Sequence, residues 1–249
     1  MPKRLVPALL SVLAGLTLTA CAPDTEKLLA PLAEMARGAV TETDARVDKA
    51  HRLLVDEVAA LPQVARGWRS DAGADQPVDW GQTPYVAVGV VDAGGVLKAA
   101  FPRAAEGFGT LLAEAADGPE VGDLHIVPNT FTFTVGLRHT PADGGGVRVT
   151  ALLDVDAVLL DGVVKPVAKA AGGYAFLANR DHRVILANNT KLIGQSMDKL
   201  GLPLPAPGAD AVGEVTVGDR AYYVACAASA GANGWVLGVL VPQDAAKGN

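Results

Sequence analysis

Histidines and glycine-rich runs are the residues of this chain most suited to chemistry, and their spacing argues against catalysis. Four histidines are scattered along the sequence: His51, His125, His139 and His182. None has the cysteine partner or the H-E-x-x-H spacing that a zinc site needs. The chain contains no Gly-x-Ser-x-Gly nucleophile motif and no P-loop, and Gly94-Gly95 and Gly144-Gly145-Gly146 are typical of hairpin turns. We therefore expect a protein that is not an enzyme and uses no metal or cofactor.

Recognition of a small molecule needs a few polar groups beside apolar walls. The guanidinium groups of Arg103 and Arg138 could each pair with a ligand carboxylate, although an isolated arginine is more often a solvated surface residue. Asp154 and Asp156 could suggest a cation site, although capping of a helix is the more common role. Aromatic residues supply the walls: Phe131 and Phe133 share one strand face, and Trp80 and Tyr85 could form another wall. The candidate ligand-binding residues are Trp80, Tyr85, Arg103, Phe131, Phe133, Arg138 and Asp154.

An aromatic strand face is more often core than pocket, so the aromatic candidates have a structural alternative. Threonines at 130, 132 and 134 alternate with Phe131 and Phe133 and occupy the opposite face of the same expected strand. Both interpretations of this strand stay open on the sequence.

The N-terminus predicts a secreted protein that is attached to a membrane. Lys3 and Arg4 precede an apolar run from Leu5 to Leu16, which is too short to span a bilayer and favours a signal peptide at 1–20. Leu18-Thr19-Ala20-Cys21 resembles the bacterial lipobox, in which the cysteine is lipidated and becomes the mature N-terminus. The resemblance implies that Cys21 is the lipid-attachment residue. The alternative is an ordinary signal peptide with a chance cysteine.

Cysteine usage and charge limit the partners further. If Cys21 carries lipid, the other cysteine, Cys226, has no partner within the chain and is expected to be a small core residue. With 50% hydrophobic and 19% charged residues, the chain is expected to fold. Loss of residues 1–20 removes two positive charges and moves the formal charge from −6 to −8. An acidic domain argues against nucleic acid as a partner.

The elements that would position these residues begin with a long helix, roughly 26–65. Its apolar residues recur at mostly helical spacings: Leu28, Leu32, Met35, Val47, Leu54, Val58 and Leu61. Cap-like residues at Thr41–Asp44 allow a kink or two successive helices, and Pro62 can end the helical pattern.

A strand, turn and returning strand occur twice, at 85–101 and 174–187. The spacing from Tyr85 to Asp92 equals that from Tyr174 to Asp181, so the unit recurs about 89 residues apart. Each copy continues with a short helical piece and three further strands. We interpret this as an internal repeat of a five-stranded antiparallel sheet with helices on one face.

The second copy contains Gly173, Tyr174, Phe176, Asp181 and Gly194. At these positions it resembles the double Cache family, which comprises PAS-like extracytoplasmic sensor modules of bacterial chemoreceptors and sensor kinases. The chain departs from the family pattern at His182, where glycine is usual, and at Asn188-Asn189, where His-Pro is common. The resemblance covers about residues 26–243. It implies an α+β fold in which a long N-terminal helix precedes two PAS-like (Cache) modules, each an antiparallel five-stranded sheet with flanking helices.

The expected organisation follows from the repeat and the resemblance. The parts are a signal peptide at 1–20, a tether and long helix at 22–83, a membrane-distal module at 84–156, a linking helix at 157–172, a membrane-proximal module at 173–243 and a tail at 244–249. The resemblance implies that a small organic ligand of the amino acid, carboxylate or amine class binds in the first module. An Arg-x-Trp-Tyr cluster used by amino-acid-binding members is absent from Phe108–Val127, so its residues are not carried over.

The expected function is that of a lipid-anchored sensor on the extracytoplasmic side of the cell envelope, at the periplasmic face of the inner or outer membrane. No transmembrane helix, kinase or signalling coiled coil follows Val241 in the sequence, so we expect the signal to pass through a partner protein, as in chemotaxis or related signal transduction. Two alternatives stay open. The chain could deliver its ligand to a transporter, or it could be an envelope scaffold that binds no small molecule.

Overall fold

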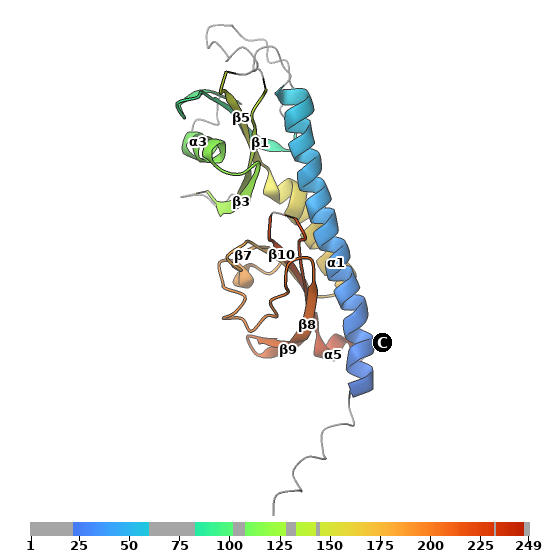
Figure 1. Ribbon diagram of the computed structural model, residues 1–249. Coiled ribbons are helices and arrows are strands. Elements are labelled where there is room, and N and C mark those ends of the chain that lie inside the picture. Colours follow the sequence, from blue (N-terminus) through green and yellow to red (C-terminus); the bar gives the residue numbers. More distant parts are fainter. Residues whose placement is uncertain are drawn as a thin grey trace, which may run out of the picture.

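A long helix and two sheet modules stacked along it make up the computed structural model, which describes residues 22–59, 83–101, 108–127, 133–142, 145–231 and 233–246 (Figure 1). The helix α1 (Ala22–Leu53) continues into a π-helical turn, η1 (Leu54–Val58). It runs unbroken through Thr41–Asp44, where the sequence allowed a kink. The Thr41 and Thr43 hydroxyls donate to the carbonyls four residues earlier, at 2.9 Å each, so both side chains are satisfied within the helix.

The first module is one antiparallel sheet with a helix on one face. Its elements are β1 (Tyr85–Val91), β2 (Leu97–Phe101), α3 (Gly109–Asp117), β3 (Val121–Ile126), β4 (Phe133–His139) and β5 (Arg148–Leu153). The strand order is β2-β1-β5-β4-β3, so β1 and β5 lie in the middle of the sheet. A π-helical segment, η4 (Asp156–Val164), and the helix α4 (Lys165–Ala171) then lead to the second module.

The second module repeats this arrangement. Its elements are β6 (Tyr174–Ala178), β7 (Val184–Ala187), the short 3₁₀ turn η5 (Thr190–Leu192), β8 (Asp210–Val217), β9 (Arg220–Ala228), β10 (Val236–Pro242) and α5 (Gln243–Ala246). The strand order β7-β6-β10-β9-β8 is the order of the first sheet. The internal repeat and the predicted fold class, a long helix followed by two five-stranded antiparallel modules with flanking helices, are therefore confirmed.

The first hairpin turns of the two modules match in their hydrogen bonds but not in the predicted register. The Asp92 N–H donates to the Val96 carbonyl at 3.0 Å, and the Asp92 carboxylate accepts from the Val96 N–H at 2.9 Å. Asn179 makes both bonds with Arg183, each at 3.0 Å. Asn179 rather than Asp181 is thus the counterpart of Asp92. The first strands begin 89 residues apart, whereas the turns recur two residues earlier because β6 is two residues shorter than β1.

One apolar core joins α1 to both sheets. Ala36 and Val47 on α1 and Leu54 on η1 are buried in the same cluster as Leu137 of the first sheet and Leu177 of the second. Burial of each Val or Leu side chain stabilises the fold by about 1.5–3 kcal/mol. The helix therefore holds the two modules together along its length. No helix among the described residues is long and apolar enough to cross a membrane.

Candidate ligand-binding face of the first module

The first sheet lies between α1 on one face and α3 on the other. Two glycines let α3 approach the strands closely: a Cβ on Gly136 would lie 2.8 Å from the Ala115 Cβ, and a Cβ on Gly89 would lie 3.1 Å from a Leu112 methyl. Along β4 and β5 the side chains alternate between the two faces. On β4, Arg138 lies on the same face as Gly136, the face that α3 covers. On β5, Arg148 and Thr150 lie on that face too.

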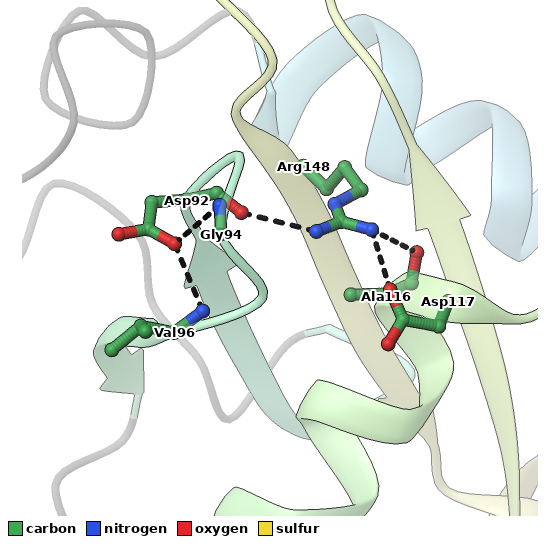
Figure 2. A network of polar contacts seen from close by, with 6 residues as sticks. All are labelled: Asp92, Gly94, Val96, Ala116, Asp117 and Arg148. Carbon is green, nitrogen blue, oxygen red and sulfur yellow. Dashed lines mark hydrogen bonds and ion pairs between the residues drawn. The ribbon is translucent and has the colours of Figure 1, made fainter.

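Arg148 ties three elements together on this face (Figure 2). Its guanidinium donates to the Ala116 carbonyl at 3.2 Å, to the Asp117 carboxylate at 2.6 Å and to the Asp92 carbonyl at 3.1 Å. Ala116 and Asp117 are the last two residues of α3. The last turn of a helix leaves carbonyls without partners, so a cation is favourable there. Arg148 therefore fixes the end of α3 against β5 and against the turn between β1 and β2.

Three buried polar atoms on this face have no hydrogen-bond partner. They are Arg138 Nε, Arg148 Nε and Thr150 Oγ1, and no other buried side-chain nitrogen or oxygen in the described parts of the chain lacks one. Arg138 and Thr150 are paired across β4 and β5, and Arg148 lies two residues from Thr150 on the same face. Buried polar groups are normally hydrogen-bonded, so we expect these three donors to face a hydrogen-bond acceptor. A carboxylate suits two guanidinium groups and a hydroxyl.

The predicted aromatic residues lie on the other face. Tyr85 is buried, and its hydroxyl donates to the Ala50 carbonyl of α1 at 2.5 Å. Burial, with a smaller effect from Glu57, raises the pKa of the Tyr85 hydroxyl. Phe133 packs in the core shared with α1. Both aromatic rings thus take the core position that the sequence left open as an alternative, and the sheet separates them from Arg138.

Asp154 caps the helical segment that follows β5. Its carboxylate accepts from the Ala157 N–H at 3.0 Å, and its N–H donates to the Pro84 carbonyl at 2.8 Å. Thr150 faces Arg138, and Asp154 follows four residues later, which is roughly 13 Å along an extended strand. The structure therefore does not bring Arg138 and Asp154 together. Trp80, Arg103, Phe131 and Cys21 lie outside the described residues.

Other reactive groups among the described residues form no second site. In the part of the chain that the structure describes, no three His, Cys, Asp or Glu side chains come together as metal ligands. Cys226 is fully buried in the core of the second module, as the sequence predicted. Burial raises the pKa of its thiol, which keeps it protonated and unreactive.

Sequence reasoning missed Arg148 and Thr150. A signal was present, because polar residues at 148 and 150 alternate with the apolar Val149 and Ala151, and this pattern predicts a strand with one polar face. What the sequence lacked was the partner strand, which places Thr150 opposite Arg138.

The geometry can be compared with known proteins. No family model and no curated protein matches the chain. Several solved structures match nearly its whole length. The ligand-binding domain of the Pseudomonas fluorescens chemoreceptor CtaA with L-serine matches with a TM-score of 0.62 and 20% identity, over 88% of this chain and 99% of that one.

Two domains from Pseudomonas aeruginosa PAO1 match similarly. The PctC amino acid chemoreceptor domain with GABA has a TM-score of 0.57 and 19% identity, over 88% of this chain and all of that one. The PctB domain with L-Arg has a TM-score of 0.55 and 16% identity, over 90% of this chain and 99% of the other. At these identities the likeness establishes the fold, which is the double Cache fold.

Proposed function

We propose that this chain is an extracytoplasmic sensor protein that binds a small carboxylate, such as an amino acid, at the α3-side face of its first module. One observation carries the proposal: Arg138 Nε, Arg148 Nε and Thr150 Oγ1, the buried side-chain polar atoms without partners among the described residues, are neighbours on that face. The similar chemoreceptor domains support it, since L-serine, GABA and L-Arg all carry a carboxylate.

The two arginines have different roles in this proposal. Arg148 is already held by three oxygens, so it positions α3 and adds positive potential. The Nε of Arg138 has no partner among the described residues, and Arg138 is therefore the residue that we expect to bind the ligand carboxylate. Its backbone is well fixed: its carbonyl lies 2.9 Å from His51 Nε2, and its N–H donates to the Glu120 carbonyl at 2.8 Å. Because the site is cationic, a carboxylate is favoured over a simple amine.

The sensor is further proposed to be lipid-anchored through Cys21 and to act through a partner protein in the cell envelope. The lipobox-like Leu18–Cys21 supports the anchor. The fold of the described residues, which resembles chemoreceptor ligand-binding domains, supports a partner that carries the output.

Thermal unfolding with a ligand panel tests the binding. The purified protein is heated with single amino acids, dicarboxylates and γ-amino acids, and with amines that lack a carboxylate. We expect a carboxylate to stabilise the protein by about 2.7 kcal/mol when it is present at a hundredfold excess over its Kd, and the simple amines to have no effect.

Substitution of the binding arginine locates the site. Arg138→Gln should weaken binding by about tenfold or more, because a charge-assisted hydrogen bond is lost. Arg37→Gln is the control, since Arg37 lies on α1 and pairs with Asp210 of the second module. A thermal shift that persists unchanged in Arg138→Gln would place the site elsewhere. If no compound in the panel shifted thermal unfolding, the proposed sensor function would be wrong.

A scaffold function is the second candidate, and the packing of α3 favours it. Ala115 and Leu112 sit directly on Gly136 and Gly89, so α3 already fills part of the face that a ligand would need. In that case the three polar atoms would be satisfied by ordered water. If no ligand in the panel shifted thermal unfolding and the protein formed a stable complex with another envelope protein, the scaffold function would be favoured over both the sensor and a ligand-delivery protein.

A further inference from the structure

The turn between β9 and β10 contacts both the first module and α1. Residues 229–231 and 233–235 belong to the second module by sequence and by sheet pairing. Their side chains nevertheless make hydrogen bonds outside that module, to β3 and to α1.

The contact with the first module is made by Trp235. Its indole Nε1 donates to the Asp123 carboxylate of β3 at 2.9 Å, and the side chain is fully buried. The same carboxylate oxygen accepts from the Leu124 N–H at 2.8 Å, which fixes its orientation. A phenylalanine would fill most of this space without a polar group, whereas a buried indole N–H needs a partner. Here the partner comes from the other module.

The contact with α1 is made by Ser229. Its hydroxyl lies 3.0 Å and 2.8 Å from the two carboxylate oxygens of Asp44, and Ser229 is fully buried. Partial burial raises the pKa of the Asp44 carboxyl, the hydrogen bond from Ser229 opposes this change, and Asp48 raises the pKa further. A half-buried carboxylate beside a second one is costly, so it is stable here because the turn supplies donors.

The two contacts are joined inside the turn. The Ser229 N–H donates to the Trp235 carbonyl at 2.8 Å, and the Gly231 N–H donates to the Ser229 hydroxyl at 3.0 Å. Arg180, between β6 and β7, also contacts the turn between β9 and β10: its Nε donates to the Asn233 carbonyl at 2.8 Å. A continuous hydrogen-bonded path therefore runs from Asp123 through Trp235 and Ser229 to Asp44.

We propose that this turn couples the conformation of the first module to that of α1. β3 pairs with β4, the strand that carries Arg138, on both sides of Asp123, at Val121 and at Leu124, so a shift of β4 reaches Asp123 through its neighbours in the sheet. The turn transmits this shift to Asp44, in the second half of α1. The coupling belongs to the fold and does not depend on the proposed ligand, so it can be tested without one.

Hydrogen exchange of the full-length chain tests the coupling, because it reports on each element separately. Asp123→Ala should speed exchange of α1 amides around Asp44 by about fivefold or more, and Asp44→Ala should do the same for β3 amides. Asp117→Ala is the control. Asp117 is an exposed carboxylate of the first module that contacts Arg148 and not the turn between β9 and β10, so its substitution should leave the exchange of α1 amides unchanged.

Trp235→Phe provides a second variant in case Asp123→Ala disturbs folding. It keeps an aromatic ring in the core and removes the N–H that reaches Asp123, together with part of the volume of the indole. The same acceleration around Asp44 is expected. If both Trp235→Phe and Asp123→Ala changed exchange only in β3 and the turn, with α1 unaffected, the contacts would be static packing and the coupling would be disproved. That result would leave the ligand-binding proposal untouched.

Discussion

His182 holds a left-handed backbone conformation, with φ at +54°, in the turn between β6 and β7. Gly95, with φ at +82°, occupies the corresponding place in the turn between β1 and β2, since each N–H donates to the residue that begins its turn. A residue that carries a Cβ atom is strained in this region, whereas glycine is not. The second module therefore carries strain at the position where the family pattern favours glycine.

Replacing His182 tests this strain. His182→Gly should stabilise the protein by about 1 kcal/mol, because relief of the strain exceeds the added flexibility of the unfolded chain. Gly95→Ala is the matched control and should destabilise by about 1 kcal/mol. Both values come from urea unfolding. A His182→Gly variant less stable than the original would mean that the imidazole makes a contribution larger than the strain.

At the scale of elements, the fit of α3 on the first sheet decides the shape of the proposed site. Ala115 rests on Gly136, where even a methyl group would come within 2.8 Å of the Ala115 Cβ. Neither atom belongs to a flexible side chain, so the helix itself must move when the contact is crowded. A single methyl group added at Gly136 on β4 is therefore expected to displace α3.

Gly136→Ala should destabilise the protein by about 1–3 kcal/mol and weaken ligand-induced stabilisation, because α3 is displaced from the strands. Gly213→Ala on β8 is the control: no atom lies within 4 Å of its added Cβ, and stability should stay nearly unchanged. Adding Ala115→Gly to Gly136→Ala should restore ligand binding by restoring the space. Thermal unfolding with and without ligand measures each effect, and failure of the double variant would contradict the packing argument.

At the scale of the whole molecule, the direction of α1 orders the modules. The second module lies along the first half of the helix and the first module at its far end (Figure 1). Ala22, the first residue of α1, directly follows Cys21 in the sequence. A lipid on Cys21 would therefore hold the second module near the membrane and present the first module away from it, as a sensor of dissolved ligands requires.

Cys21→Ser tests the anchor. A multiply acylated cysteine gains about 0.8 kcal/mol for each buried CH₂, so the original protein should sediment with membranes and the variant should be released. Cys226→Ser is the control for loss of a thiol elsewhere, although its burial makes a modest loss of stability expected. Unchanged membrane retention of Cys21→Ser would rule out the lipid anchor.

The sequence by itself determined the helix, the two hairpins and their repetition, because hydrophobic periodicity and turn residues act over a few neighbouring positions. It also predicted Cys226 as a core residue and Arg138 as a candidate for ligand binding. Its register for the repeat was wrong at the turns, since the shorter β6 moves Asn179 into the place of Asp92.

Only the tertiary structure decided which residues meet. The sheet puts Tyr85 and Phe133 on the face opposite Arg138, and it pairs Arg138 with Thr150. It also brings Trp235 to Asp123 across the boundary between the modules. These contacts join residues far apart in the chain, and their geometry depends on strand register and on the packing of α1 and α3, which no local pattern of residues encodes.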